Sequence, residues 1–149
     1  MIILIPTYNR PKKLARSLEF YARTGVSSKY EVIVLDGSPE AVGNINKTSC
    51  KDFGATHSWH PARNYFERLV DAFANIDNDQ LVCLSPDEDV FFPEYLSAAS
   101  LFLNENADYT LFIGRYITYS KPLFGLHRVN FARDTIFDLD LRSQNPIVR

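Results

Sequence analysis

Three consecutive acidic residues, Asp87, Glu88 and Asp89, follow an apolar run in the stretch LVCLSPDEDVFFPE. Carboxylates this close repel one another and lose hydration beside a buried strand, so the cluster costs stability unless a cation offsets it. An Asp-x-Asp pair offers hard oxygen ligands that suit Mg²⁺ or Mn²⁺ together with substrate phosphates. The alternative is a solvated loop that leads into a helix, where negative charge is favourable.

Two other short polar loops also follow apolar runs that are typical of buried strands. Residues 2–5, IILI, precede the loop PTYNR, and residues 31–35, EVIVL, precede the loop DGS. Because ligands of open α/β sheets bind beyond the carboxyl ends of the strands, we expect these loops and the acidic loop to form one site. In such a site Asp36 could accept hydrogen bonds from a base or a ribose.

Helical periodicity separates the predicted strands. A helix is predicted from Pro11 to a stop at Gly25, another from Pro61, and another from Pro93, while residues 107–120 are typical of a longer strand. Residues 40–60 are poorly patterned. This alternation predicts an α/β fold with an open, mostly parallel, Rossmann-like sheet and helices on both faces, in which the last strands can run antiparallel.

Length and composition indicate one soluble domain over residues 1–149. Hydrophobic residues make up 46% of the chain and charged residues 23%, which is typical of a folded protein. The net charge of -2 gives no electrostatic case for binding nucleic acid or an anionic membrane. The apolar runs are far shorter than the roughly 20 residues of a transmembrane helix, and we therefore predict a cytoplasmic protein.

The cysteine and histidine spacing argues against a zinc site. Cys50 and Cys83 have no partner pattern, and we predict buried, reduced thiols. His57, His60 and His127 have no metal-ligand spacing with them. Glycine-rich phosphate loops and a serine nucleophile motif are absent from the sequence, so a metal would have to bind the phosphates of a nucleotide.

The ordered segments IPTYNRPKKLARSLEFY, VIVLDGSPE, PARNYFERLVDAFANIDNDQLVCLSPDEDVFFPEYL and NADYTLFIGRYI resemble the nucleotide-binding half of family 2 glycosyltransferases, which have the GT-A fold. The resemblance implies a metal-dependent, inverting transfer of a sugar from a UDP-sugar to a saccharide, lipid or protein acceptor.

The resemblance also implies a donor site formed by Pro6, Thr7, Tyr8, Arg10, Asp36, Arg63, Asn64 and Asp87, with Asp87 and Asp89 as ligands of Mn²⁺ or Mg²⁺. Simpler roles are open to several of these residues. Thr7 and Asn9 can cap a helix, Asp36 can make an Asx-turn, and Arg63 and Asn64 can be an ordinary helix start.

The sequence departs from the family pattern at two places in this site. Leu35 stands where many members have a second Asp beside Asp36. Pro86 stands where members usually have an Asp, which leaves open which acid of residues 87–89 binds the metal.

The catalytic base is the third departure. Family members carry it in a longer second half, and here Asp134, Asp138 and Asp140 in FARDTIFDLDLRSQ give only a faint match. Two alternatives therefore stand beside a glycosyltransferase. One is a truncated or degenerate nucleotide-sugar-binding module without activity, and the other is a nucleotidyltransferase.

Overall fold

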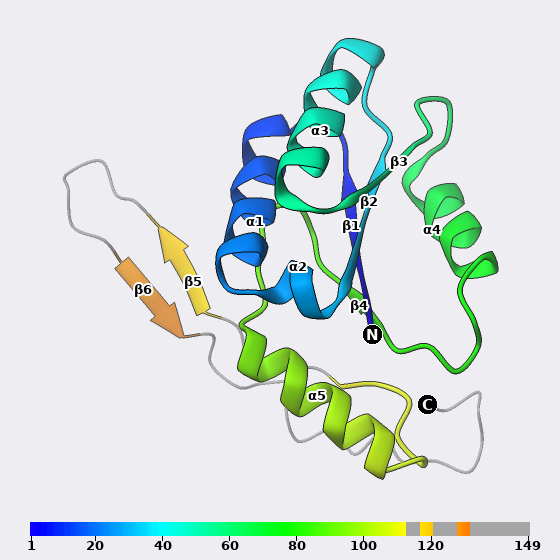
Figure 1. The fold of residues 1–149 in the computed structure, drawn as a ribbon, viewed down its shortest axis with the longest axis vertical. Helices are drawn as coiled ribbons and strands as arrows, with labels where there is room; N and C mark the ends of the chain where they lie inside the picture. Colours follow the sequence, from blue (N-terminus) through cyan, green and yellow to red (C-terminus); the bar gives the residue numbers. More distant parts are fainter. Residues whose placement is uncertain (113–116, 121–127, 132–149) are drawn as a thin grey trace. The chain divides into compact units, whose positions relative to one another are not determined.

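The computed structural model describes residues 1–112, 117–120 and 128–131 (Figure 1). The chain divides into two compact units, Met1–Ser97 and Ala98–Arg149. All the candidate site residues named above lie in the first unit, whereas the three aspartates considered as a catalytic base lie outside the described residues.

The first unit is built on a parallel sheet. Its strands are β1 (Ile2–Thr7), β2 (Glu31–Asp36), β3 (Thr56–Trp59) and β4 (Val82–Leu84), in the order β3-β2-β1-β4. Thr7 pairs with Asp36, and Asp36 pairs with Trp59, so the carboxyl ends of three strands are level. The predicted open parallel sheet is confirmed.

Helices cover both faces of this sheet. They are α1 (Pro11–Arg23), α2 (Val26–Lys29), α3 (Glu40–Phe53), α4 (Tyr65–Ala74) and the start of α5 (Pro93–Glu105). Figure 1 shows α1, α2 and α3 on one side of the strands and α4 on the other. Right-handed crossovers explain this, because the chain moves outward from β1 to β3 and then returns past β1 to β4.

Helix α1 follows its sequence signals closely. Pro11 occupies the first helical turn, and Gly25 follows the last turn with a φ of 76°, a left-handed conformation that glycine adopts without strain. Leu14, Leu18 and Tyr21 are fully buried, as their spacing predicts. They pack against β1 and β2 in a core that includes Ile3, Ile5, Val32, Val34, Val26, Tyr30, Cys50 and Leu96.

Residues 40–60 contain a helix and a strand that we did not predict. The buried residues of α3 are Gly43, Asn46 and Cys50, which are small or polar and so show no apolar period. Strand β3, with the sequence THSW, has an exposed or partly exposed position at every residue. Helix α3 contacts α1 and β2, and β3 pairs with β2 and contacts α3, and no local pattern reveals these contacts.

Two predicted boundaries were wrong. Helix α4 begins at Tyr65 rather than at Pro61, because the side chain of Asn64 caps it. Residues 107–112 contain no strand, so the long strand predicted for 107–120 is present in the described residues only as β5, Ile117–Ser120.

The second unit contains the rest of α5, where Phe102 lies 5.0 Å from Tyr109 and 5.6 Å from Phe112 between ring centroids. It also contains an antiparallel pair, β5 with β6 (Arg128–Phe131). Across the ranges that the structure describes, no helix is long and apolar enough to span a membrane.

Both cysteines are free thiols, as predicted. Cys50 is buried, whereas Cys83 is only partly buried, which corrects the prediction for that residue. Burial raises the pKa of Cys50 to about 12 and that of Cys83 to about 11. Neither thiol is therefore a reactive thiolate near neutral pH.

Candidate functional site

The loops that follow β1 and β4 meet at the carboxyl edge of the sheet. The Thr7 hydroxyl donates to Asp87 Oδ2 at 2.8 Å, and the two residues are only 3% and 4% exposed. The Ser17 hydroxyl of α1 donates to the Asp87 carbonyl oxygen at 2.9 Å. Strands β1 and β4 are neighbours at the point where the strand order reverses, which is where open α/β sheets bind ligands.

Basic side chains at the start of α1 neutralise much of the acidic loop. Arg10 Nη1 lies 3.4 Å from Asp87 Oδ1 and 3.4 Å from Glu88 Oε2. Lys13 forms an ion pair with Glu88, and Arg16 donates to the Glu88 carbonyl oxygen at 3.1 Å. The hydrogen bond and charge of Lys13, together with the charge of Arg10, lower the pKa of Glu88. Arg10 and Lys13 therefore offset much of the repulsion within the acidic loop, so repulsion by itself does not call for a metal ion here.

Asp89 is the unpaired acid of this loop. Its side chain is exposed, and within the described part of the chain its carboxylate has no hydrogen bond or ion pair. Those residues also contain no group of three or more His, Cys, Asp or Glu side chains that could hold a metal. One exposed carboxylate does fit an ion such as Mg²⁺, which takes most of its ligands from water and substrate phosphates.

Asp36 lies at the predicted strand end but is fully buried. Its Oδ1 accepts from the Ser38 N–H at 2.8 Å. Its Oδ2 accepts from Asn46 Nδ2 at 2.8 Å and lies 2.9 Å from His57 Nε2. Burial alone raises the pKa of this carboxyl, but the hydrogen bonds from Ser38, His57 and Asn46 outweigh burial and hold the pKa below its usual value. Both oxygens are thus engaged within the protein.

Ser38, in the loop that follows β2, is bonded both to the loop that follows β1 and to the end of β3. Its hydroxyl accepts from the Asn9 N–H at 2.9 Å, and its carbonyl oxygen accepts from Trp59 Nε1 at 2.9 Å. Asn9 has a φ of 56°, in the left-handed region that Asn tolerates. The neighbouring Tyr8 is 61% exposed and open to a ligand, whereas Pro6 is buried within β1.

Arg68 on α4 is a charged residue of the site that the sequence analysis missed. It is 4% exposed, and its Nη1 donates to the Thr7 carbonyl oxygen at 2.9 Å. The Gly37 N–H donates to the same oxygen at 3.1 Å, and a Cβ on Gly37 would lie 1.9 Å from Arg68 Nη1. A side chain at position 37 would therefore have to displace the Arg68 guanidinium from this contact. The available signal was an arginine on the helical stripe that also carries Tyr65, Leu69 and Ala72.

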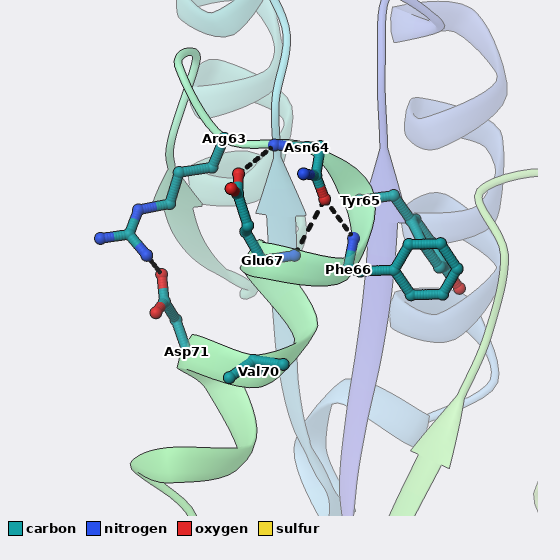
Figure 2. A pocket seen from close by; sticks show the side chains of 7 residues that line it. All are labelled: Arg63, Asn64, Tyr65, Phe66, Glu67, Val70 and Asp71. Atoms are coloured by element: carbon teal, nitrogen blue, oxygen red, sulfur yellow. Dashed lines mark hydrogen bonds and ion pairs between the residues drawn. The ribbon is translucent and has the colours of Figure 1, made fainter.

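Arg63 and Asn64 lie at the start of α4, as Figure 2 shows. Asn64 Oδ1 accepts from the N–H groups of Phe66 at 2.9 Å and Glu67 at 3.1 Å, and Glu67 Oε2 accepts from the Asn64 N–H at 2.8 Å. Arg63 forms an ion pair with Asp71. They line an open groove to which the loops after β1, β2 and β4 do not contribute. Among the described residues, the side-chain hydrogen bonds and ion pair of Arg63 and Asn64 are all made within α4 and its cap, and none is made to those loops.

We expect Asn64→Ala to lower the free energy of unfolding by about 1 kcal/mol, because Ala lacks the side-chain oxygen that accepts from the N–H groups of Phe66 and Glu67. Urea denaturation measures the change. Glu67→Gln is the matched control, since Gln can still accept from the Asn64 N–H. A loss from Glu67→Gln as large as the loss from Asn64→Ala would contradict this account of the cap.

The sequence model of glycosyl transferase family 2 matches residues 2–147. The chain belongs to this family. The resemblance seen in the sequence is thereby confirmed over nearly the whole chain, and the parallel sheet agrees with the fold that it implies. Searches of curated proteins and of solved structures found no significant match. Membership of a glycosyltransferase family supports sugar transfer from a nucleotide-sugar donor as the general activity.

Proposed function

We propose that this family 2 glycosyltransferase binds a uridine-type nucleotide sugar together with Mn²⁺ or Mg²⁺ and transfers the sugar, with inversion, to an acceptor hydroxyl. The observation that carries the proposal is the buried contact between Thr7 and Asp87 at 2.8 Å. It joins the two strand ends where an open α/β sheet of this order binds its ligand.

The base and ribose would lie over the loop that follows β1. Tyr8 offers an exposed ring, and the backbone of Pro6 and Thr7 borders the same loop. Asp87 lies beside Thr7, where its carboxylate can accept a hydrogen bond from a ribose hydroxyl. Asp36 has no free oxygen in this structure, so its contribution in the proposal is to hold the Ser38 loop in place.

The diphosphate would lie near Asp89, Arg10 and Lys13. Asp89 carries the carboxylate that is available to the divalent ion, and Asp87 lies two positions before it in the sequence. When bound, the ion would neutralise charge on the departing nucleoside diphosphate. Arg10 and Lys13 are half exposed and lie within reach of the acidic loop, so they can add positive charge on the same side.

An inverting transfer also needs a general base that reaches the acceptor hydroxyl. The candidates Asp134, Asp138 and Asp140 lie outside the described residues.

Calorimetric titration tests the donor assignment. UDP, ADP, GDP and uridine are titrated separately into the protein, with Mn²⁺ and with a chelator. We expect UDP to bind more tightly than the other ligands and to depend on Mn²⁺. Equal affinity for all four ligands, or no binding, would refute the proposal. UDP binding without hydrolysis or transfer of any UDP-sugar would favour the binding module over the enzyme.

A further inference from the structure

Arg68 is the buried side chain of α4, the helix that covers the second face of the sheet. Several other large side chains of this helix are exposed, including Phe66 at 74% and Val70 at 67%, whereas Leu69 is partly buried. The guanidinium therefore makes the buried contact between α4 and the sheet edge, through the Thr7 carbonyl oxygen at 2.9 Å.

Attaching a helix to a sheet through a buried guanidinium costs the free energy of desolvating a charged group. Burial lowers the pKa of Arg68, and the negative charge of Asp36 acts in the opposite direction. Its Nε is also buried and has no hydrogen-bond partner among the described residues, which adds to the cost. Apolar residues of similar volume often replace buried charges without loss of stability, so attachment alone does not require an arginine here.

The position of the guanidinium indicates what it does. The Thr7 carbonyl oxygen accepts from both Arg68 and the Gly37 N–H, so one atom connects the loops after β1 and β2 with α4. The Thr7 side chain in turn donates to Asp87 at 2.8 Å. A shift of the Thr7 backbone would therefore move the contact between Thr7 and Asp87.

We propose that Arg68 is a positioning residue of the donor site, which fixes the Thr7 backbone and, through it, the paired side chains of Thr7 and Asp87. The inference rests on the proposed function, because it assigns Arg68 a role in the affinity for the donor nucleotide. The absence of a side chain on Gly37 belongs to the same arrangement, since a Cβ there would displace the guanidinium.

Two variants separate positioning from simple packing. Arg68→Met keeps most of the volume but removes the charge and the donors, whereas Arg68→Lys keeps a charge and a donor. We expect the Kd for UDP with Mn²⁺ to rise about tenfold or more in Arg68→Met and only about threefold in Arg68→Lys, measured by calorimetry well below the melting temperature. Packing alone predicts the reverse order, with Met tolerated better than Lys.

Arg23→Met is the control, since it removes an arginine whose ion pair with Glu19 is exposed on α1. We expect it to leave the Kd unchanged. Combining Arg68→Met with Asp87→Asn should change the Kd by less than the product of the two single effects, because both act on one contact. Unchanged affinity in Arg68→Met, or multiplicative effects in the double variant, would overturn the inference.

A readout without nucleotide separates this inference from the proposed function. If the wild-type protein does not bind UDP, the proposed function fails, and hydrogen exchange of the Gly37 amide still tests the positioning role. We expect Arg68→Met to speed exchange of that amide about tenfold relative to wild type, while Arg23→Met leaves it unchanged. Unchanged protection of Gly37 in Arg68→Met would overturn the inference.

Discussion

Asp89→Ala is expected to weaken UDP binding in the presence of Mn²⁺ by about 10- to 100-fold, and to leave metal-free binding almost unchanged. Asp89 is the acid of the loop whose carboxylate is exposed and has no partner within the described residues, whereas Asp87 and Glu88 are held by Thr7, Arg10 and Lys13. Removing it should therefore remove a metal ligand without disturbing the network. Calorimetric titration with Mn²⁺ and with a chelator measures both values.

The control for this variant is Asp79→Ala, which removes an exposed acid from the loop before β4. It tests whether a change of net charge alone weakens nucleotide binding. The melting temperatures of both variants should stay near that of the wild type, because neither side chain is buried. Full Mn²⁺-dependent affinity in Asp89→Ala would exclude this residue from the metal site.

Asp36→Asn is expected to destabilise the fold by about 2–4 kcal/mol. The side chain is fully buried, and the three donors that face it, from Ser38, Asn46 and His57, are arranged for a carboxylate that only accepts. An amide at this position would place its own N–H group against one of those donors. Urea denaturation at neutral pH measures the loss, and Asp79→Asn is the exposed control.

The same variant should change how stability depends on pH. The folded-state pKa of Asp36 is lowered from an ordinary value of 3.8. Its contribution is therefore complete above pH 4, where the unfolded chain is also ionised, and is lost as the pH falls through the lowered folded-state pKa. As the pH falls from 6 to 3, we therefore expect less acid destabilisation in Asp36→Asn than in the wild type. An identical pH profile for both proteins would contradict the lowered pKa.

Much of the fold could be predicted because its signals are local. The apolar runs at β1 and β2 and the period of Leu14, Leu18 and Tyr21 in α1 come from side chains that face the core, whereas the apolar run at β4 is only partly buried. The order of these elements indicated a parallel sheet, and their loops indicated one site at its carboxyl edge. The family motifs lie in the same loops, so the resemblance and the pattern agreed.

Helix α3 and strand β3 were missed for a related reason. Their inward residues, such as Asn46 and His57, are polar because they serve Asp36 rather than an apolar core. The hydrophobic periodicity of a sequence cannot distinguish a polar residue that is buried in a hydrogen bond from a polar residue that is exposed to solvent. Local sequence patterns therefore do not reveal α3 and β3, the two elements that surround the buried Asp36.

The sequence by itself determined the class of fold, the strand ends that meet at one edge, and the family. Only the tertiary structure decided which charges are satisfied there. Glu88 pairs with Lys13, which lies 75 positions away in the sequence, and the Thr7 carbonyl oxygen accepts from Arg68, which lies 61 positions away. The Asp89 side chain is exposed to solvent. Electrostatic pairing depends on distance in space and on burial, and neither can be read from separation along the chain.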